Sequence, residues 1–203
     1  MPKLSDADRA ARRQHLVDAA WRRIGESGYR DTTVDDVCDE AGVSKGAFYG
    51  YFETKQDLLV AMLDEETDAL NAVAAELADL DISGAERVRL FTQAMLRLAD
   101  DPARVQLRAD MWSALATDPV VRDRMANAVS RRWSVLREWI VRSIRAGELA
   151  PDERRANALA STLLALTDGL ILHRALDPTG FRWSNIRAVM DALLAGIERP
   201  AHA

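Results

Sequence analysis

The chain has 203 residues, of which 48% are hydrophobic and 29% charged, and its formal net charge at pH 7 is −5. A single cysteine excludes an internal disulfide and a cysteine-rich zinc site. The net acidity neither requires nor excludes nucleic acid, because the field near a phosphate depends on local charge. Helix-forming residues, above all Ala, Leu and Arg, outnumber β-branched ones, which predicts an all-α fold.

The sequence shows no signal for a membrane protein. Residues 1–6 lack the apolar core of a signal peptide. The most apolar stretch, residues 158–172, contains four polar side chains and is too short to span a bilayer. We therefore expect a cytoplasmic protein without a membrane partner.

Local signals predict the first four helices. An apolar stripe from Leu16 to Ile24 belongs to the first helix, which Gly28 ends. The second helix is short and stops at Gly42, and Cys38 on its apolar face is interpreted as a small core residue rather than a redox sensor. Hydroxyl side chains that can cap a helix precede the second, third and fourth helices: Thr32 or Thr33, Ser44 and Thr54.

The remaining chain continues as helices separated by short breaks. After a break at residues 79–84 the apolar stripe resumes. An aspartate followed by proline, the usual order of N-cap and first helical residue, begins two further helices at residues 101 and 118. Glycine or proline marks the ends of the last three predicted helices. The first of them closes at Gly147, the second runs from Pro151-Asp152 to residues 177–180, and the third runs from Trp183 to Gly196. The sequence thus predicts about nine helices, no strand and a domain boundary near residue 55.

Residues 32–52 form a helix-turn-helix candidate, in which two short helices are joined by a glycine turn. Gly42 permits the tight turn, and Val43 is expected to be buried so that it fixes the angle between the helices. The second of these helices begins with the small and polar residues Ser44-Lys45-Gly46-Ala47, which suits entry into the major groove of DNA. Phe48 is expected to face the core.

Around this motif the sequence resembles the TetR family of repressors. The runs that carry the resemblance lie within residues 10–60 and have unbroken spacing: Gly28-Tyr29-Arg30-Asp31-Thr32-Thr33-Val34, Ala41-Gly42-Val43-Ser44-Lys45-Gly46, and Tyr49-Gly50-Tyr51-Phe52-Glu53-Thr54-Lys55 with Leu58. The resemblance implies that residues 1–55 form a three-helix DNA-binding domain whose third helix reads bases. It implies contacts to base edges or phosphates for Thr33, Ser44, Lys45, Gly46, Ala47, Tyr49, Tyr51 and Lys55.

Residues 56–203 resemble the regulatory domain of the BetI-like branch of that family, through the runs Asp110-Met111-Trp112, Asp118–Arg122, Thr167–Leu170 and Leu176–Pro178. The resemblance implies a six-helix effector-binding and dimerisation domain, whose last two helices pair with those of a second subunit. Residues 158–172, apolar nearly all round, fit burial on more than one side. A homodimer with two-fold symmetry also matches a palindromic operator in double-stranded DNA.

An unknown small-molecule effector is the second expected ligand. Large, adaptable apolar side chains and two polar groups that can orient a polar or cationic compound give the candidate effector-site residues Met95, Met111, Trp112, Trp133, Trp139, Asp168 and His173. The alternative that each is an ordinary core or interface residue stays open. We expect no cofactor and no metal site.

The resemblance to this family implies a transcriptional repressor that an effector releases from DNA. Effector binding among the fourth to eighth helices would tilt the fourth helix and change the separation of the two DNA-binding domains. An activator of the same family is an alternative, because sequence does not separate the two. A small-molecule-processing enzyme is less favoured, since His15, His173 and His202 are scattered and neither a nucleophile elbow nor a phosphate-binding glycine loop occurs.

Overall fold

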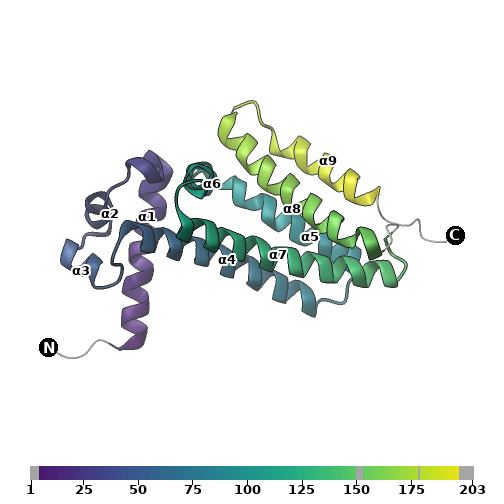
Figure 1. Cartoon of the computed structure of the whole chain (residues 1–203), viewed down its shortest axis with the longest axis horizontal. Coiled ribbons are helices and arrows are strands. Elements are labelled where there is room, and N and C mark those ends of the chain that lie inside the picture. Colours follow the sequence, from purple (N-terminus) through teal and green to yellow (C-terminus); the bar gives the residue numbers. More distant parts are fainter. Residues whose placement is uncertain (1–4, 150–152, 178, 197–203) are drawn as a thin grey trace. The chain divides into compact units, whose positions relative to one another are not determined.

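The computed structural model describes residues 5–149, 153–177 and 179–196 (Figure 1). These residues form nine α-helices, one short 3₁₀ helix and no strand, which confirms the predicted all-α fold. The helices are α1 (Asp6–Asp31), α2 (Val34–Ala41), α3 (Lys45–Tyr49), α4 (Lys55–Asp79), α5 (Gly84–Arg97), the 3₁₀ helix η1 (Leu98–Asp100), α6 (Pro102–Leu115), α7 (Pro119–Arg145), α8 (Glu153–Leu176) and α9 (Trp183–Ala195).

Contacts between the helices divide the chain into two compact units. Unit 1 consists of residues 1–66 and 101–124, and unit 2 of residues 67–100 and 125–203. This division differs from the boundary predicted near residue 55, because α6 packs along α1 although the two helices are far apart in sequence. They approach closely at Gly25, where an added Cβ would lie 2.9 Å from the Cβ of Ala103.

The helices of unit 1 begin and end at the residues that can terminate them. Gly28 interrupts α1 with φ 79° and ψ 161°, a backbone conformation that only glycine adopts readily. Thr33 begins α2 through a capping box with Asp36, and Thr54 exchanges the same two hydrogen bonds with the aspartate three residues later at the start of α4. These predicted caps are confirmed, whereas the Thr32 hydroxyl donates to the Gly28 carbonyl, 2.7 Å away.

The two Asp-Pro pairs also begin helices as predicted. Asp101 accepts the N–H of Ala103 at 2.9 Å at the start of α6, and Asp118 accepts the N–H of Val120 at 2.9 Å at the start of α7. In each case the proline between them occupies the first helical position, where no N–H is needed.

Unit 1 has an apolar core that contains a buried ion cluster. The Glu66 carboxylate, 4% exposed, accepts a hydrogen bond from the Arg108 guanidinium and lies 3.9 Å from Nη1 of Arg104. The Arg104 guanidinium in turn lies 4.7 Å from the centre of the Trp21 ring. Cys38 is buried as expected, and burial raises the pKa of its thiol.

Unit 2 packs α5 against α8 and α9. Phe91 of α5 and Trp139 of α7 meet edge to face with ring centroids 5.6 Å apart. Gly147, with φ 78°, follows the end of α7 where the sequence predicted a helix stop. The residues expected to mark the start of α8 and the break after it, Pro151-Asp152 and Pro178, lie outside the described residues.

The α8 helix is apolar on most of its surface. Among the described residues, its segment 154–176 is the one helix long and apolar enough to cross a membrane, with 28% of its most apolar stretch buried within the chain. The helix that contains residues 158–172 is longer than this apolar stretch, so its length by itself does not exclude a span. A core helix of a globular protein meets the same criterion of length and composition.

Candidate nucleic-acid interface

Helices α2 and α3 form the helix-turn-helix that the sequence predicted. Gly42 follows α2 in the left-handed conformation, with φ 63° and ψ 35°, as a tight turn between two helices requires. Ser44 then begins α3, and its hydroxyl accepts the N–H of Ala47 at 3.2 Å. α2 packs against both α1 and α3, so that α3 is held on a scaffold of two helices (Figure 1).

One side of α3 is anchored and its N-terminal end is open. Phe48 is completely buried and lies 5.6 Å, centroid to centroid, from the buried ring of Phe52. The four residues before it, Ser44 to Ala47, are all exposed. Val43 is half-buried rather than buried, because it directly follows the exposed glycine turn. The fully buried Phe48 and the hydrogen bond from the Val43 N–H to the Cys38 carbonyl, 3.0 Å, therefore hold the turn.

Lys45, the only charged residue of α3, is paired with an acid of α2. Its ammonium lies 2.7 Å from Oδ1 of Asp35, and both side chains are more than half exposed. The hydrogen bond that the Lys45 ammonium donates to Asp35 raises the pKa of Lys45. An exposed pair of this kind contributes little to stability, so Lys45 can leave Asp35 for another acceptor at small cost.

The residues predicted to contact phosphates lie around α3 in different settings. Thr33 is exposed, and its hydroxyl accepts the backbone N–H of Asp36 at 3.2 Å, which makes it a helix cap in this structure. The same hydroxyl donates to Oδ2 of Asp36 at 2.6 Å. Hydrogen bonds from Thr33 lower the pKa of Asp36. Tyr49 is 53% exposed and contacts Phe48 edge to face, whereas Tyr51 is half-buried.

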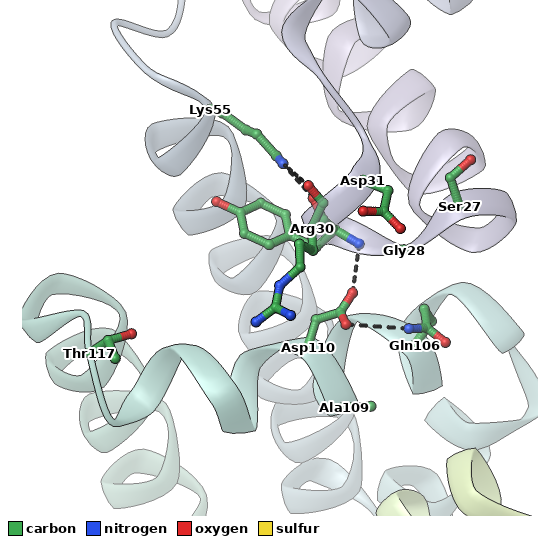
Figure 2. Close-up of a pocket in the computed structure, with 10 residues that line it drawn as sticks. Ser27, Gly28, Arg30, Asp31, Lys55, Gln106, Ala109, Asp110 and Thr117 are labelled. Atoms are coloured by element: carbon green, nitrogen blue, oxygen red, sulfur yellow. Dashed lines mark hydrogen bonds between the residues drawn. The ribbon is translucent and has the colours of Figure 1, made fainter.

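Lys55 lies in the first turn of α4, as predicted, and its side chain returns to the end of α1 (Figure 2). The ammonium donates to the carbonyl of Tyr29 and, at 3.3 Å, to that of Arg30. It also lies 4.2 Å from the centre of the Tyr29 ring. Burial lowers the pKa of Lys55, against the opposing effect of nearby carboxylates, of which Asp110 is the first.

Arginines of α1 extend the exposed surface beside α3, and sequence reasoning did not assign them to the site. The Arg9 guanidinium lies 5.9 Å from the centre of the Tyr51 ring, and Arg13 lies 5.0 Å from that of Phe52. A groove of about 420 Å³ between α1 and α3 is lined by Arg9 and Arg12 together with Asp6, Gly46, Ala47, Gly50 and Tyr51. The clustering of arginine in the first helical turns is the sequence signal that could have found them.

A second hollow, of about 510 Å³, lies within unit 1 where the end of α1 meets α4 and α6 (Figure 2). Asp110 of α6 accepts the backbone N–H of Tyr29 at 2.6 Å through Oδ2, and the Gln106 amide at 3.4 Å through Oδ1. Lys55 is the one sequence-predicted site residue in its lining. Within this lining, Lys55 and Asp110 are therefore already engaged with the backbone, and Gln106 with Asp110.

The candidate effector residues do not line either of these two hollows. Met111 and Trp112 belong to unit 1 and the others to unit 2. Met111, Met95 and Trp139 are buried as core residues, whereas Trp112 is 53% exposed. The structure thus places these four in ordinary packing or at the surface, and their effector role stays a prediction.

The remaining three candidates already have partners within unit 2. Trp133 donates its indole N–H to the Ser161 hydroxyl at 3.1 Å. Asp168 pairs with the buried Arg132 at 3.3 Å. His173 is exposed and stacks on Phe181 with ring centroids 6.2 Å apart. Across the part of the chain that the structure describes, no group of three or more His, Cys, Asp or Glu could hold a metal ion.

Comparison with known proteins assigns both halves of the chain. Residues 16–62 match the family "Bacterial regulatory proteins, tetR family", and residues 84–198 match "BetI-type transcriptional repressor, C-terminal". The transcriptional regulator BetI of Cronobacter sakazakii is 32% identical over 185 residues, which cover 88% of this chain and 86% of that protein.

Solved structures show the same fold. A TetR transcription regulator from Haloarcula marismortui matches with a TM-score of 0.83 at 21% identity, over 94% of this chain and 100% of the other. A transcriptional regulator from Saccharomonospora viridis in complex with choline matches with a TM-score of 0.75, also at 21% identity, over 94% and 100%. The relatives are transcriptional regulators and not enzymes. The chain therefore belongs to the TetR family of transcriptional regulators and carries a BetI-type C-terminal domain.

Proposed function

We propose that this protein is a repressor that binds a palindromic operator as a homodimer and is released from it by a small-molecule effector. The observation that carries the proposal is the exposed N-terminal end of α3, Ser44 to Ala47, on a helix anchored by the fully buried Phe48. A recognition helix reads DNA with its N-terminal residues while its other face packs on the protein. Such a regulator acts in the cytoplasm, with the DNA that it binds.

The side chains around α3 divide into base-contacting and phosphate-contacting groups. Lys45 can donate to O6 or N7 of guanine in the major groove after leaving Asp35. Gly46 and Ala47 are small and exposed, which allows the backbone to approach the base edges. The hydroxyls of Thr33, Tyr49 and Tyr51 and the ammonium of Lys55 are the proposed phosphate contacts.

Dimerisation is supported by apolar surface that unit 2 leaves uncovered. Most of the apolar stretch of α8 is not buried within the chain. Val189 and Leu193, four residues apart on α9, are 57% and 55% exposed. Residues at this spacing share one face of a helix, and contiguous exposed apolar surface marks an interaction site. A second copy of the chain is the occupant that a two-fold symmetric operator complex needs.

Effector control is supported by the BetI-type C-terminal domain and by the choline complex of the Saccharomonospora viridis regulator. An effector weakens operator binding only when it binds the DNA-incompetent state more tightly. A coupling of about 1–3 kcal/mol corresponds to roughly a 5- to 150-fold loss of DNA affinity. Choline is therefore the first compound to test, within a library of small polar and cationic molecules.

Selection of bound duplexes from a random DNA pool tests the proposal directly. The purified chain should enrich a palindromic sequence, and Lys45→Ala should alter the preferred bases at matching positions of both half-sites. Lys55→Ala should weaken binding to all sequences alike and reduce the salt slope by about one. Arg142→Ala, which removes an exposed arginine paired with Glu138 in unit 2, is the matched control and should leave the selected sequence unchanged.

Two outcomes would contradict parts of this proposal. A wild-type protein that binds no duplex at low ionic strength would rule out the DNA-binding function. Sedimentation should show a dimer for the wild type and a monomer for the double variant Val189→Asp, Leu193→Asp; a wild-type monomer bound to a single half-site would refute the dimeric repressor.

A further inference from the structure

The backbone of Tyr29 is held from two sides by opposite charges. Its N–H donates to Oδ2 of Asp110 at 2.6 Å, and its carbonyl accepts from the Lys55 ammonium. Figure 2 shows both hydrogen bonds at the end of α1, with Asp110 reaching it from α6 and Lys55 from α4. Three helices of unit 1 therefore meet at one residue of the backbone.

The break at Gly28 makes this arrangement possible. With φ 79° and ψ 161°, Gly28 turns the chain away from the helical path just before Tyr29. A side chain at this position would also be tightly packed, because a Cβ at Gly28 would lie 3.2 Å from Oδ2 of Asp110 and 3.3 Å from Nε2 of Gln106. The close approach of α6 and the direction of the Tyr29 N–H are thus parts of the same local geometry.

The turn held in this way leads directly to the DNA-binding residues. The carbonyls of Tyr29 and Arg30 hold the Lys55 ammonium, and two residues beyond Asp31 the backbone reaches Thr33, the first cap of α2. A shift of the Tyr29 peptide would therefore move the acceptors of Lys55 and the start of α2 together. An ammonium has three N–H donors, and the two carbonyls orient it for a further acceptor.

We propose that Asp110 is a positioning residue for DNA binding, which fixes the Tyr29 turn by accepting its N–H and thereby orients Lys55 toward a DNA phosphate. The inference rests on the proposed function of α3 and Lys55 and adds a residue of α6 to it. Asp110 does not touch DNA in this scheme, and its effect passes through the Tyr29 peptide. Hydrogen bonds to a charged acceptor are the stronger ones in proteins, which suits a contact that must hold a turn.

The direction of the change in DNA affinity distinguishes this positioning role from a purely electrostatic effect of the carboxylate. Removing an acid from a DNA-binding protein raises its affinity for DNA by reducing repulsion of the phosphates. Asp123→Ala removes an exposed carboxylate of unit 1 that holds no turn of α1 and measures this effect alone. Asp110→Ala should instead weaken operator binding, by about tenfold if one charge-assisted hydrogen bond is lost.

A double-mutant cycle with Lys55 tests the connection. In the Lys55→Ala background, Asp110→Ala should cost no more than about twofold, because the group that it positions is already absent. Asp110→Asn, which keeps a carbonyl oxygen as acceptor for the Tyr29 N–H, should restore most of the affinity. It also supplies a folded protein for measurement if Asp110→Ala does not fold.

Several results would overturn the inference without touching the proposed function. Once the wild type is known to bind the operator, the inference fails if Asp110→Ala binds it as tightly as the wild type or more tightly. It also fails if the double variant loses affinity by the product of the losses of Asp110→Ala and Lys55→Ala. The same holds if Asp110→Asn binds no better than Asp110→Ala. Failure of the proposed function has a different signature, since the wild-type protein itself would then bind no duplex.

Discussion

The short helices of unit 1 and the long helices of unit 2 are held in different ways. In unit 1, α2 has 8 residues and α3 has 5, and both begin with a hydroxyl cap. In unit 2, most of α7 and all of α8 are long helices, of 27 and 24 residues, whose buried faces hold them. A helix shorter than roughly 12–15 residues is marginal by itself, so the short helices depend on their ends and on the residues that brace them.

The exact positions of single side chains therefore matter more for the short helices of unit 1 than for the long helices of unit 2. A recognition helix must present a few side chains at fixed places, and caps, glycine turns and braces such as Asp110 set those places one residue at a time. A unit built on long apolar faces tolerates many side chains of similar volume. Substitutions of the same chemical kind should therefore have unequal effects in the two units.

The largest expected difference concerns ion pairs. Glu66→Gln removes the charge at the buried cluster of unit 1 and takes away the carboxylate that accepts from the buried Arg108, which should cost about 3–5 kcal/mol of unfolding free energy. Glu86→Gln makes the same change at the partly exposed pair with Arg89 in unit 2, where the loss should stay below about 1 kcal/mol. Urea denaturation of both variants measures the difference. Equal losses would show that burial of the Glu66 cluster does not matter.

Two glycines with nearly the same φ give the next largest effect. Gly147 in unit 2 has φ 78° and open space around it, so Gly147→Ala should cost about 1–2 kcal/mol for the backbone conformation alone. Gly28 in unit 1 has φ 79° and close neighbours on α6, so Gly28→Ala should cost about 2–3 kcal/mol. Thermal denaturation compares the two. Operator affinity should fall only for Gly28→Ala, and an unchanged affinity would disconnect the α1 break from DNA binding.

Most of the fold followed from local sequence signals. Thr33, Ser44 and Thr54 were identified as caps and Gly28, Gly42 and Gly147 as stops because each acts on its own backbone, within a few residues. The helix-turn-helix was predictable for the same reason. The packing of α6 on α1 was not predictable, because it joins residues about 80 positions apart. Nothing in the sequence around Gly25 indicates that Ala103 is its neighbour.

The site was predictable in part. Lys45, Gly46 and Ala47 were placed on an exposed helix end by spacing alone, and their exposure follows from the burial of Phe48. The partners of Lys45 and Lys55, an acid of α2 and two carbonyls of α1, depend on side-chain directions that spacing does not specify. The effector residues had no local signature, because a tryptophan or methionine on a helix is equally suited to a core and to a ligand site.

A smaller effect is expected from the caps themselves. Thr33→Ala in unit 1 and Ser83→Ala in unit 2 each remove a hydroxyl that accepts a backbone N–H, from Asp36 and Glu86 respectively. Each should lower the unfolding free energy by about 1 kcal/mol. Only Thr33→Ala should also weaken operator binding, since its hydroxyl is a proposed phosphate contact. A matching loss of affinity in Ser83→Ala would mean that the two units are not separate in this respect.

The smallest expected effect is the response of two carboxylates to salt. Hydrogen bonds from the neutral Thr33 lower the pKa of Asp36, whereas the hydrogen bond and charge of Arg89 lower that of Glu86. In both cases the folded pKa lies below the unfolded one. The stabilisation is therefore present above the ordinary values of 3.8 and 4.5 and is lost as the pH falls through the lowered values.

Titration of the carboxyl carbon shifts by NMR, at low salt and at about 1 M NaCl where screening acts over roughly 3 Å, distinguishes the two causes. The midpoint of Glu86 should move up toward its ordinary value, because part of its lowering comes from a charged partner. The midpoint of Asp36 should move less, because a capping box of neutral donors does not depend on ionic strength. A larger shift at Asp36 would show that the start of α2 is held by the surrounding charges, Arg23 among them, rather than by its cap.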